Sequence, residues 1–238
     1  MVNSLLINQV VSHLQSLGDE SIAEHSQRFF KTGEGEYGYG DKFWGIRVPV
    51  IRKTIPKFKQ LTADDALELL KHPVHEVRLF ALLHWVYQYN RADEEKKAQI
   101  YHYYLEHTHF INNWDLVDTS CHHIVGAYLK DKSREPLYQL AQSTCLWQKR
   151  ISMMSTYHFI KQDDFDDALA LAKILLNDSH DLIHKVVGWM LREVGNRDRQ
   201  VEEAFLLAHY QNMPRTMLRY AIEKFPKERR QEYLKGEL

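Results

Sequence analysis

Apolar residues recur at intervals of three and four positions along most of the chain. The interval is visible in five stretches: Leu5, Val10 and Leu14; Val77, Phe80, Ala81 and His84; Ile151, Met154 and Tyr157; Leu169, Ala172 and Leu176; and Val186, Trp189 and Met190. Such spacing places the apolar side chains on one face of an α-helix. Strand-like alternation is weak and confined to residues 43–50, which include Pro49. The pattern predicts an all-α protein.

Short polar connections divide the helical pattern into pairs. Helices are expected to start near Thr62, Glu94, Arg134, Asp164, Arg199 and Pro214. Residues 73–89, 145–159 and 179–194 each open with a polar or proline-marked turn and carry an early basic residue, at a spacing that fits repeats of roughly 35 to 40 residues. This period predicts a HEAT- or armadillo-like solenoid of stacked hairpins with a concave face. A closed helical bundle has the same local periodicity and is the alternative.

The glycines concentrate in one segment. Five of the ten, Gly33, Gly35, Gly38, Gly40 and Gly45, fall within thirteen residues. We expect residues 33–41 to form a mobile loop, after which Pro49 opens a basic helix. The segment has neither the GxxxxGK[ST] order nor a GxGxxG after a strand, so we reject a nucleotide site.

Composition is that of an ordinary globular protein. The chain has 238 residues, of which 44% are hydrophobic and 26% charged, and we expect one domain over residues 1–238 and a monomer. The longest apolar stretches, such as residues 79–87, are interrupted by residues like His84 and fall short of the roughly 18 residues of a membrane span. Residues 1–9 show no secretory pattern, so we expect a cytoplasmic location.

Charge is balanced overall but separated along the chain. The 31 Lys and Arg against 32 Asp and Glu argue against a protein that coats nucleic acid through bulk positive charge. Residues 28–59, however, hold eight basic and three acidic residues, whereas residues 161–183 hold two basic and six acidic ones. One surface is therefore expected to attract phosphate and another to repel it.

Two cysteines and fourteen histidines are too scattered to define a metal or nucleophile site. Cys121 and Cys145 have no CxxC spacing, and we expect both to be reduced and buried. No HExxH motif is present, so neither a metal nor a cofactor is expected.

Residues 112–118 form the first candidate site. If they are helical, Trp114 and Asp118 share one face, four positions apart. Asn112 or Asn113 suits the helix cap, and Asp115 suits its first turn. Asp118 stands too far along the helix to cap its N-terminus. Its role is therefore functional or, alternatively, it pairs with an arginine of an adjacent repeat.

Two basic segments follow. Lys149 and Arg150 stand near the start of a helix, where positive charge opposes the macrodipole, so an anion is a candidate ligand. Alternatively, Lys149 is solvated and Arg150 pairs with Asp118.

Further along, Lys185, Trp189 and Arg192 form one helical stripe of cation, aromatic ring and cation, which fits a sugar-phosphate backbone. The alternative is a half-buried Trp189 between cations that reach into solvent. In either case, Gly188 is expected to permit close helix packing.

Four segments of the chain resemble the motifs of one protein family and occur in the same order as those motifs. They are residues 43–49 (FWGIRVP) with Arg52, residues 114–118 (WDLVD), residues 146–150 (LWQKR) and residues 188–193 (GWMLRE). Together they are similar to the bacterial AlkD family of DNA alkylation repair glycosylases over nearly the whole chain. The resemblance implies a HEAT-like solenoid whose basic concave face holds duplex DNA, and excision of cationic N3- and N7-alkylated purines without a metal or organic cofactor.

The resemblance also implies roles for individual residues. Asp118 is the implied catalytic carboxylate, Trp114 and Trp189 hold the backbone of the lesioned nucleotide, and Arg150 positions Asp118 or a phosphate. The implied DNA contacts are Phe29, Arg47, Arg52, Lys149, Lys185 and Arg192. Two departures from the family's pattern concern the contacts near the lesion: Phe29 stands where another member has tyrosine, and the 33–41 loop is longer than in that member.

The residues are compatible with this chemistry. A cationic alkylpurine leaves without a general acid, so one carboxylate suffices to stabilise the positive sugar and orient water. No lysine is nominated as a Schiff-base nucleophile, so strand cleavage is not expected. The rival hypothesis is a noncatalytic helical-repeat module that binds nucleic acid or protein through the same face.

Overall fold

The computed structural model describes residues 2–238. Within that range the chain is helical, its one β-type contact being an isolated parallel bridge between Lys42 and Val74. The prediction of an all-α protein is confirmed. The backbone divides into two compact units, residues 1–120 and 121–238, which are described separately. The expectations of one domain and of a HEAT-like solenoid stay predictions.

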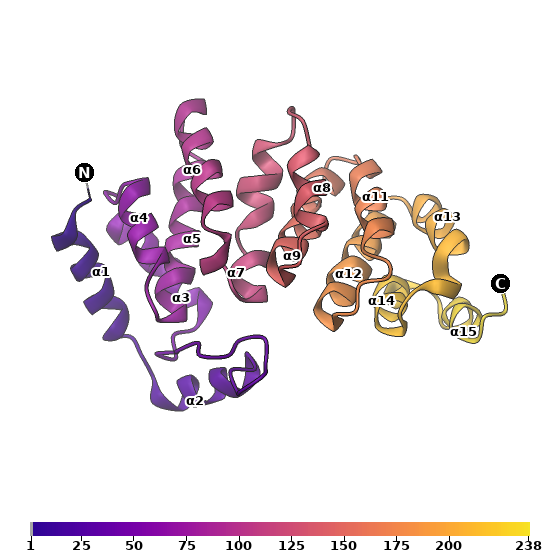
Figure 1. Ribbon diagram of the computed structural model, residues 1–238, viewed down its shortest axis with the longest axis horizontal. Coiled ribbons are helices and arrows are strands. Elements are labelled where there is room, and N and C mark those ends of the chain that lie inside the picture. Colours follow the sequence, from indigo (N-terminus) through magenta and orange to yellow (C-terminus); the bar gives the residue numbers. More distant parts are fainter. Residues whose placement is uncertain (1) are drawn as a thin grey trace. The chain divides into compact units, whose positions relative to one another are not determined.

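The helices of the first unit, indigo to magenta in Figure 1, are α1 (Ser4–Gln15), α2 (Glu20–Phe29), α3 (Val48–Thr54), the 3₁₀ turn η1 (Ile55–Phe58), α4 (Ala63–Leu70), α5 (His75–Tyr89), α6 (Glu94–Glu106), the 3₁₀ turn η2 (Thr108–Phe110) and α7 (Trp114–Asp118). The second unit contains the π-helix η3 (His122–Gly126), α8 (Glu135–Ala141), α9 (Leu146–Ser155), α10 (Tyr157–Ile160), α11 (Asp166–Ile174), α12 (Asp181–Arg197), α13 (Arg199–His209), the 3₁₀ turns η4 (Tyr210–Asn212) and η5 (Ile222–Lys224), α14 (Arg215–Ala221) and α15 (Lys227–Lys235).

Local sequence signals place the helix starts. Thr62, for example, caps α4 in a capping box with Asp65, in which each side chain satisfies a backbone N–H of the other. The observed first residues Ala63, Glu94, Glu135, Asp166, Arg199 and Arg215 lie within two positions of the expected starts. Residues 43–50 form no strand, because they run irregularly into α3, which carries a proline in its first turn.

Helix α5 is the centre of the first unit. All of its residues except Tyr87 are buried, and Trp85 donates its indole N–H to the carbonyl of Ala63 in α4 at 3.1 Å. A helix buried on all sides needs partners for each of its polar groups, including the ionisable side chains of its first turn.

The prediction of which residues form the buried face of α1 is wrong at one position, Leu5. Leu5 is 69% exposed, whereas Leu6, Val10 and Leu14 are buried. The buried three stand four positions apart and share one face, from which Leu5 is rotated by about 100°.

Helix α12 is the centre of the second unit, and α14 packs closely against it. A Cβ atom on Gly188 would lie 2.3 Å from the carbonyl oxygen of Met217 and 2.6 Å from Cβ of Tyr220. The close helix approach expected at Gly188 is confirmed. A second expectation fails in this unit, since Cys121 is buried but Cys145 is only half-buried. Cys145 precedes the first turn of α9 and lies outside its packed face.

In the part of the chain that the structure describes, no helix combines the length and the apolar character that crossing a membrane requires.

Candidate nucleic-acid interface

Helix α7 carries the candidate residues of the first unit. Asn113 opens the helix, and its side-chain oxygen accepts a hydrogen bond from the Trp114 amide at 2.8 Å. Leu116 and Val117 are fully buried, whereas Trp114 and Asp118 are half-buried. Because these two stand four positions apart, they share one face of the helix.

Trp114 packs in a cluster of aromatic rings. Its ring centre lies 5.2 Å from that of Phe30, in a stacked arrangement, and 5.7 Å from that of Phe29, edge to face. Phe30 also stacks on Phe43 at 5.1 Å. Such contacts favour particular ring orientations. The structure thus brings together two predicted DNA-facing residues, Trp114 and Phe29.

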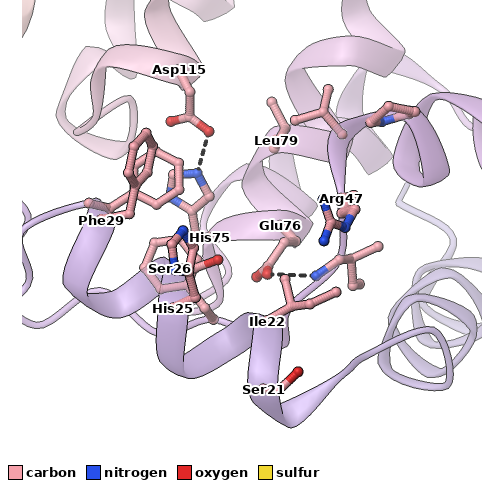
Figure 2. A pocket seen from close by; sticks show the side chains of 15 residues that line it. Ser21, Ile22, His25, Ser26, Phe29, Arg47, His75, Glu76, Leu79 and Asp115 are labelled. Atoms are coloured by element: carbon pink, nitrogen blue, oxygen red, sulfur yellow. Dashed lines mark hydrogen bonds and ion pairs between the residues drawn. The ribbon is translucent and has the colours of Figure 1, made fainter.

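A buried imidazole joins α7 to the glycine-rich segment. His75 donates from Nε2 to Asp115 Oδ2 at 2.8 Å, drawn in Figure 2, and from Nδ1 to Asp41 Oδ2 at 2.9 Å. Both ring nitrogens can donate only when the imidazole is protonated. Burial alone would lower the pKa of His75, but the two carboxylates outweigh it and raise that pKa to about 9. His75 is therefore a cation at neutral pH.

Arg78 completes this network. Its guanidinium donates to Asp41 Oδ1 at 2.6 Å and to the Asn112 side-chain oxygen at 3.0 Å. Burial raises the pKa of Asp41, yet the hydrogen bond from His75 and the charge of Arg78 more than offset this, so that the pKa lies below its ordinary value. The network consists of two carboxylates and two cations, all buried.

Glu76 holds the segment that leads into α3. Its carboxylate accepts the backbone N–H groups of Trp44, Gly45 and Ile46 at 3.0, 2.7 and 3.1 Å. Gly45 has φ of 81°, and a Cβ there would lie 2.0 Å from the carbonyl oxygen of Asp19. Only glycine fits this position, which fixes the chain just before Arg47.

The predicted DNA-binding cations of the first unit lie in solvent. Arg47 stands immediately before α3 and Arg52 lies in its last turn, and both are exposed. The other basic residues of the segment are exposed as well: Arg28, Lys31, Lys42, Lys53, Lys57 and Lys59. These exposed cations carry the charge that phosphate binding requires.

In the second unit, α9 carries Arg150 and Lys149. Arg150 is only 5% exposed and donates from Nη1 to the carbonyl of Leu182 in α12 at 2.7 Å. Lys149 forms an ion pair with Asp178 at 2.6 Å. The interpretation of Lys149 as simply solvated is wrong, because the segment before α12 brings a carboxylate to it.

The stripe on α12 is paired with acidic side chains. Lys185 pairs with Asp181 at 2.7 Å, Trp189 donates its indole N–H to Glu193 at 2.8 Å, and Arg192 pairs with Glu223. Trp189 is half-buried. The predicted alternation of cations and ring is present on α12. The carboxylates that pair with it were not predicted.

The family follows from the sequence as a whole. The model of a family described as DNA alkylation repair enzyme matches residues 10–225. The chain belongs to this family.

No curated protein matches this member of the DNA alkylation repair family. Among solved structures, it is similar to a predicted DNA alkylation repair enzyme from Enterococcus faecalis, with 13% sequence identity and a TM-score of 0.67. The match covers 88% of this chain and 97% of that chain. At this identity the likeness concerns the fold alone.

The sequence resemblance to alkylation repair proteins is thereby confirmed, and it indicates an enzyme role in alkylation damage repair with DNA as partner. The roles of single residues stay predictions. Within residues 2–238, no three His, Cys, Asp or Glu side chains converge as a metal site would need.

Sequence reasoning missed the buried network of this repair-family member. Asp115 was expected in a helix first turn, where it does accept the Leu116 amide at 2.8 Å, but its link to His75 was not foreseen. A signal was present: His75, Glu76 and Arg78 open a helix that is otherwise strongly apolar. Three ionisable groups in such a helix indicate a buried polar network.

Proposed function

We propose that this chain is a DNA glycosylase that hydrolyses the N-glycosidic bond of cationic N3- or N7-alkylated purines in duplex DNA. The observation that carries the proposal is α7, where Trp114 and Asp118 share a half-buried face in a chain of the DNA alkylation repair family. Asn113, Asp115 and the aromatic cluster support this helix, and the ring of Trp114 is held by packed neighbours.

The chemistry needs little from the protein. An alkylated purine already carries positive charge, so the bond between its nitrogen and C1′ of the sugar breaks with the electron pair going to the base. The base leaves neutral, and positive charge develops on the sugar. A carboxylate at Asp118 stabilises that charge and orients the water whose oxygen bonds to C1′, while the water's proton passes to solvent. The product is an abasic site in an unbroken strand.

In this proposal Trp114 and Trp189 lie against the backbone of the lesioned nucleotide, and Arg150 positions Asp118 or a phosphate. Phe29, Arg47, Arg52, Lys149, Lys185 and Arg192 contact DNA. A HEAT-like concave face, a monomeric state, a cytoplasmic location and the lack of a cofactor and of lyase activity belong to the same proposal.

The decisive experiment measures free base released from methylated duplex DNA. Wild type is expected to release 7-methylguanine or 3-methyladenine, and Asp118→Asn is expected to bind the duplex while releasing at least about a hundredfold less, because the developing charge loses its carboxylate. Asp131→Asn, at an exposed aspartate, is the matched control and should behave as wild type.

Two results would contradict the proposal. Equal release by wild type and Asp118→Asn would remove Asp118 from the chemistry. No release by folded wild type that still binds DNA would favour the noncatalytic binding module, for which Asp118→Asn should keep or improve affinity because it removes a negative charge near phosphate.

A further inference from the structure

Helix α7 depends on its neighbours for its position. It has only five residues, and a helix that short gains little stability from its own hydrogen bonds. His75, at the start of α5, donates to Asp115 of α7 at 2.8 Å. Arg78, one turn later, donates to the side chain of Asn112, two residues before the helix, at 3.0 Å. Whatever places α7 also places both of its candidate side chains.

His75 ties α7 to the glycine-rich segment through its two ring nitrogens. One donates to Asp115 and the other to Asp41, which ends that segment. A neutral imidazole carries a single N–H. It can therefore serve only one of the two carboxylates, and the other then faces a nitrogen lone pair in a buried site, which is unfavourable. Loss of the proton thus breaks the contact of α5 with either α7 or the glycine-rich segment.

The ring of His75 reaches Trp114 by a second route. Its centre lies 4.6 Å from that of Phe43 and 5.1 Å from that of Phe30, and a cation is attracted to the faces of aromatic rings at such distances. Phe30 in turn stacks on Trp114 at 5.2 Å. The orientation of the tryptophan ring therefore depends on where the imidazole lies.

The other charged groups near His75 are paired or exposed. His75 is 1% exposed and lies beside a cleft of about 630 Å³, of which one face of α2 forms the outer wall (Figure 2). The ionisable groups around it are Glu76 and Arg78 of its own helix, His25 of α2 and Arg47 before α3. Glu76 accepts three backbone N–H groups, and Arg78 pairs with one of the two carboxylates. His25 and Arg47 are exposed, where salt screens their charges.

We propose that His75 is a positioning residue for the glycosylase reaction: as an imidazolium it holds α7 to the glycine-rich segment and so sets the place of Asp118 and Trp114. The inference rests on the proposed function, which nominates these two residues. His75 is buried and acts through Asp115. A displacement of about 1 Å at a reacting group costs about a hundredfold in rate. Loss of the imidazolium should therefore slow base release far more than it weakens DNA binding, which depends on exposed cations.

The pH dependence of base release gives the first test. Single turnovers on methylated duplex are measured across the pKa of His75, which its two carboxylates raise to about 9, and release without protein is subtracted. The wild-type rate should fall as the pH rises through that value. Asp115→Asn removes one of the two carboxylates, so the fall should move to lower pH by about one unit or more. Asp131→Asn, at an exposed aspartate, is the matched control and should keep the wild-type profile.

His75→Gln gives the second test. Its amide is neutral at every pH, so base release should be about a hundredfold slower at neutral pH and should show no alkaline fall. The Kd for duplex DNA should change less than about twofold, because the exposed cations are retained. His109→Gln, at an exposed histidine, should match wild type in both measurements. If His75→Gln does not fold, the comparison of wild type with Asp115→Asn still decides.

A measurement without DNA separates this proposal from the glycosylase itself. The protein is labelled with 5-fluorotryptophan, and the fluorine NMR signal of Trp114, one of five tryptophans, is assigned by its absence from Trp114→Phe. This signal should shift with pH at the midpoint of the His75 titration, because Phe30 and Asp115 connect the two rings. The signal of Trp189, in the second unit, should not follow that titration.

A Trp114 signal that follows His75, together with an alkaline fall in release that Asp115→Asn moves, supports the positioning role. The proposal is overturned if folded His75→Gln or Asp115→Asn keeps the wild-type rate and pH profile, or if the Trp114 signal does not respond to the His75 titration. If wild type releases no base at any pH while the Trp114 signal follows His75, the glycosylase is refuted and the placement of α7 by His75 is supported.

Discussion

The two candidate tryptophans have different surroundings. Trp114, in the first unit, stacks on Phe30, which packs on the buried His75 cation. Trp189, in the second unit, lies on α12, which packs closely against α14 at Gly188. Its indole N–H donates to Glu193, and Lys185 on the same helix forms a surface ion pair with Asp181.

The difference shows two ways of placing an aromatic ring at a candidate DNA surface. Around Trp114, the stabilising charges are buried and hence weakly screened by salt, whereas the cations on the surface are exposed. Around Trp189, the charges are paired on the surface, where salt screens them. Four substitutions or conditions should separate the two arrangements.

The largest effect is expected from His75→Leu. The change leaves Asp41 and Asp115 without their shared cation in a buried site, and removing one partner of such a network costs about 3–5 kcal/mol of unfolding free energy. Denaturant unfolding measures this loss. His109→Leu, at an exposed histidine, should change stability by less than about 0.5 kcal/mol; a similar small loss for His75→Leu would mean that the network does not support the first unit.

High pH should weaken the same network without a substitution. The pKa of His75 is raised from 6.5 to about 9 by Asp41 and Asp115, so its stabilising contribution is complete below pH 6.5 and declines as the pH rises through 9. Up to about 3 kcal/mol should be lost. An NMR titration of the His75 ring checks the pKa, and a midpoint near 6.5 would disprove the doubly bonded cation.

Gly188→Ala should disturb the second unit. The new methyl group would meet the Met217 carbonyl, a backbone atom that cannot turn aside, and overpacking of this kind costs about 1–3 kcal/mol. Gly33→Ala is the matched control, since its Cβ meets only the carboxylate end of Glu36. Thermal unfolding that is equal for the two variants would show that α12 and α14 have room to separate.

The smallest effect concerns the surface cations. Arg52→Ala removes an exposed charge and should lower the slope of log Kd for duplex DNA against log salt by about 0.9. Lys185→Ala should lower it less, because Asp181 already neutralises Lys185, and Asp181→Asn should strengthen binding. Equal slopes for Arg52→Ala and Lys185→Ala would erase the distinction between the two surfaces.

Sequence reasoning succeeded where the deciding interactions are local. The start of α4 follows from Thr62 and Asp65, three positions apart, and the cap of α7 from Asn113. It failed where partners are distant, as for His75, whose carboxylates stand 34 and 40 positions away. Lys149 is similar, since Asp178 lies 29 positions further along the chain.

One missed pairing was visible in the sequence. Asp181 and Lys185 stand four positions apart on α12, the spacing at which opposite charges meet on a helix. The alternation of Lys185, Trp189 and Arg192 predicts a stripe of cations and ring, but it takes no account of the acidic residue one turn earlier. Arg192, whose partner Glu223 is 31 positions away, gave no such signal.

The sequence by itself determined the helical class, most helix starts, the exposed basic segment and, through the order of its motifs, the family. These properties depend on periodicity, caps and composition, which act over a few residues. Only the tertiary structure decided that His75 is a buried cation, that the α12 stripe is paired with carboxylates, and that one face of α2 lines a cleft. Each of these depends on side chains from different helices, because burial and mutual distance set the charge state of a group and the space beside it.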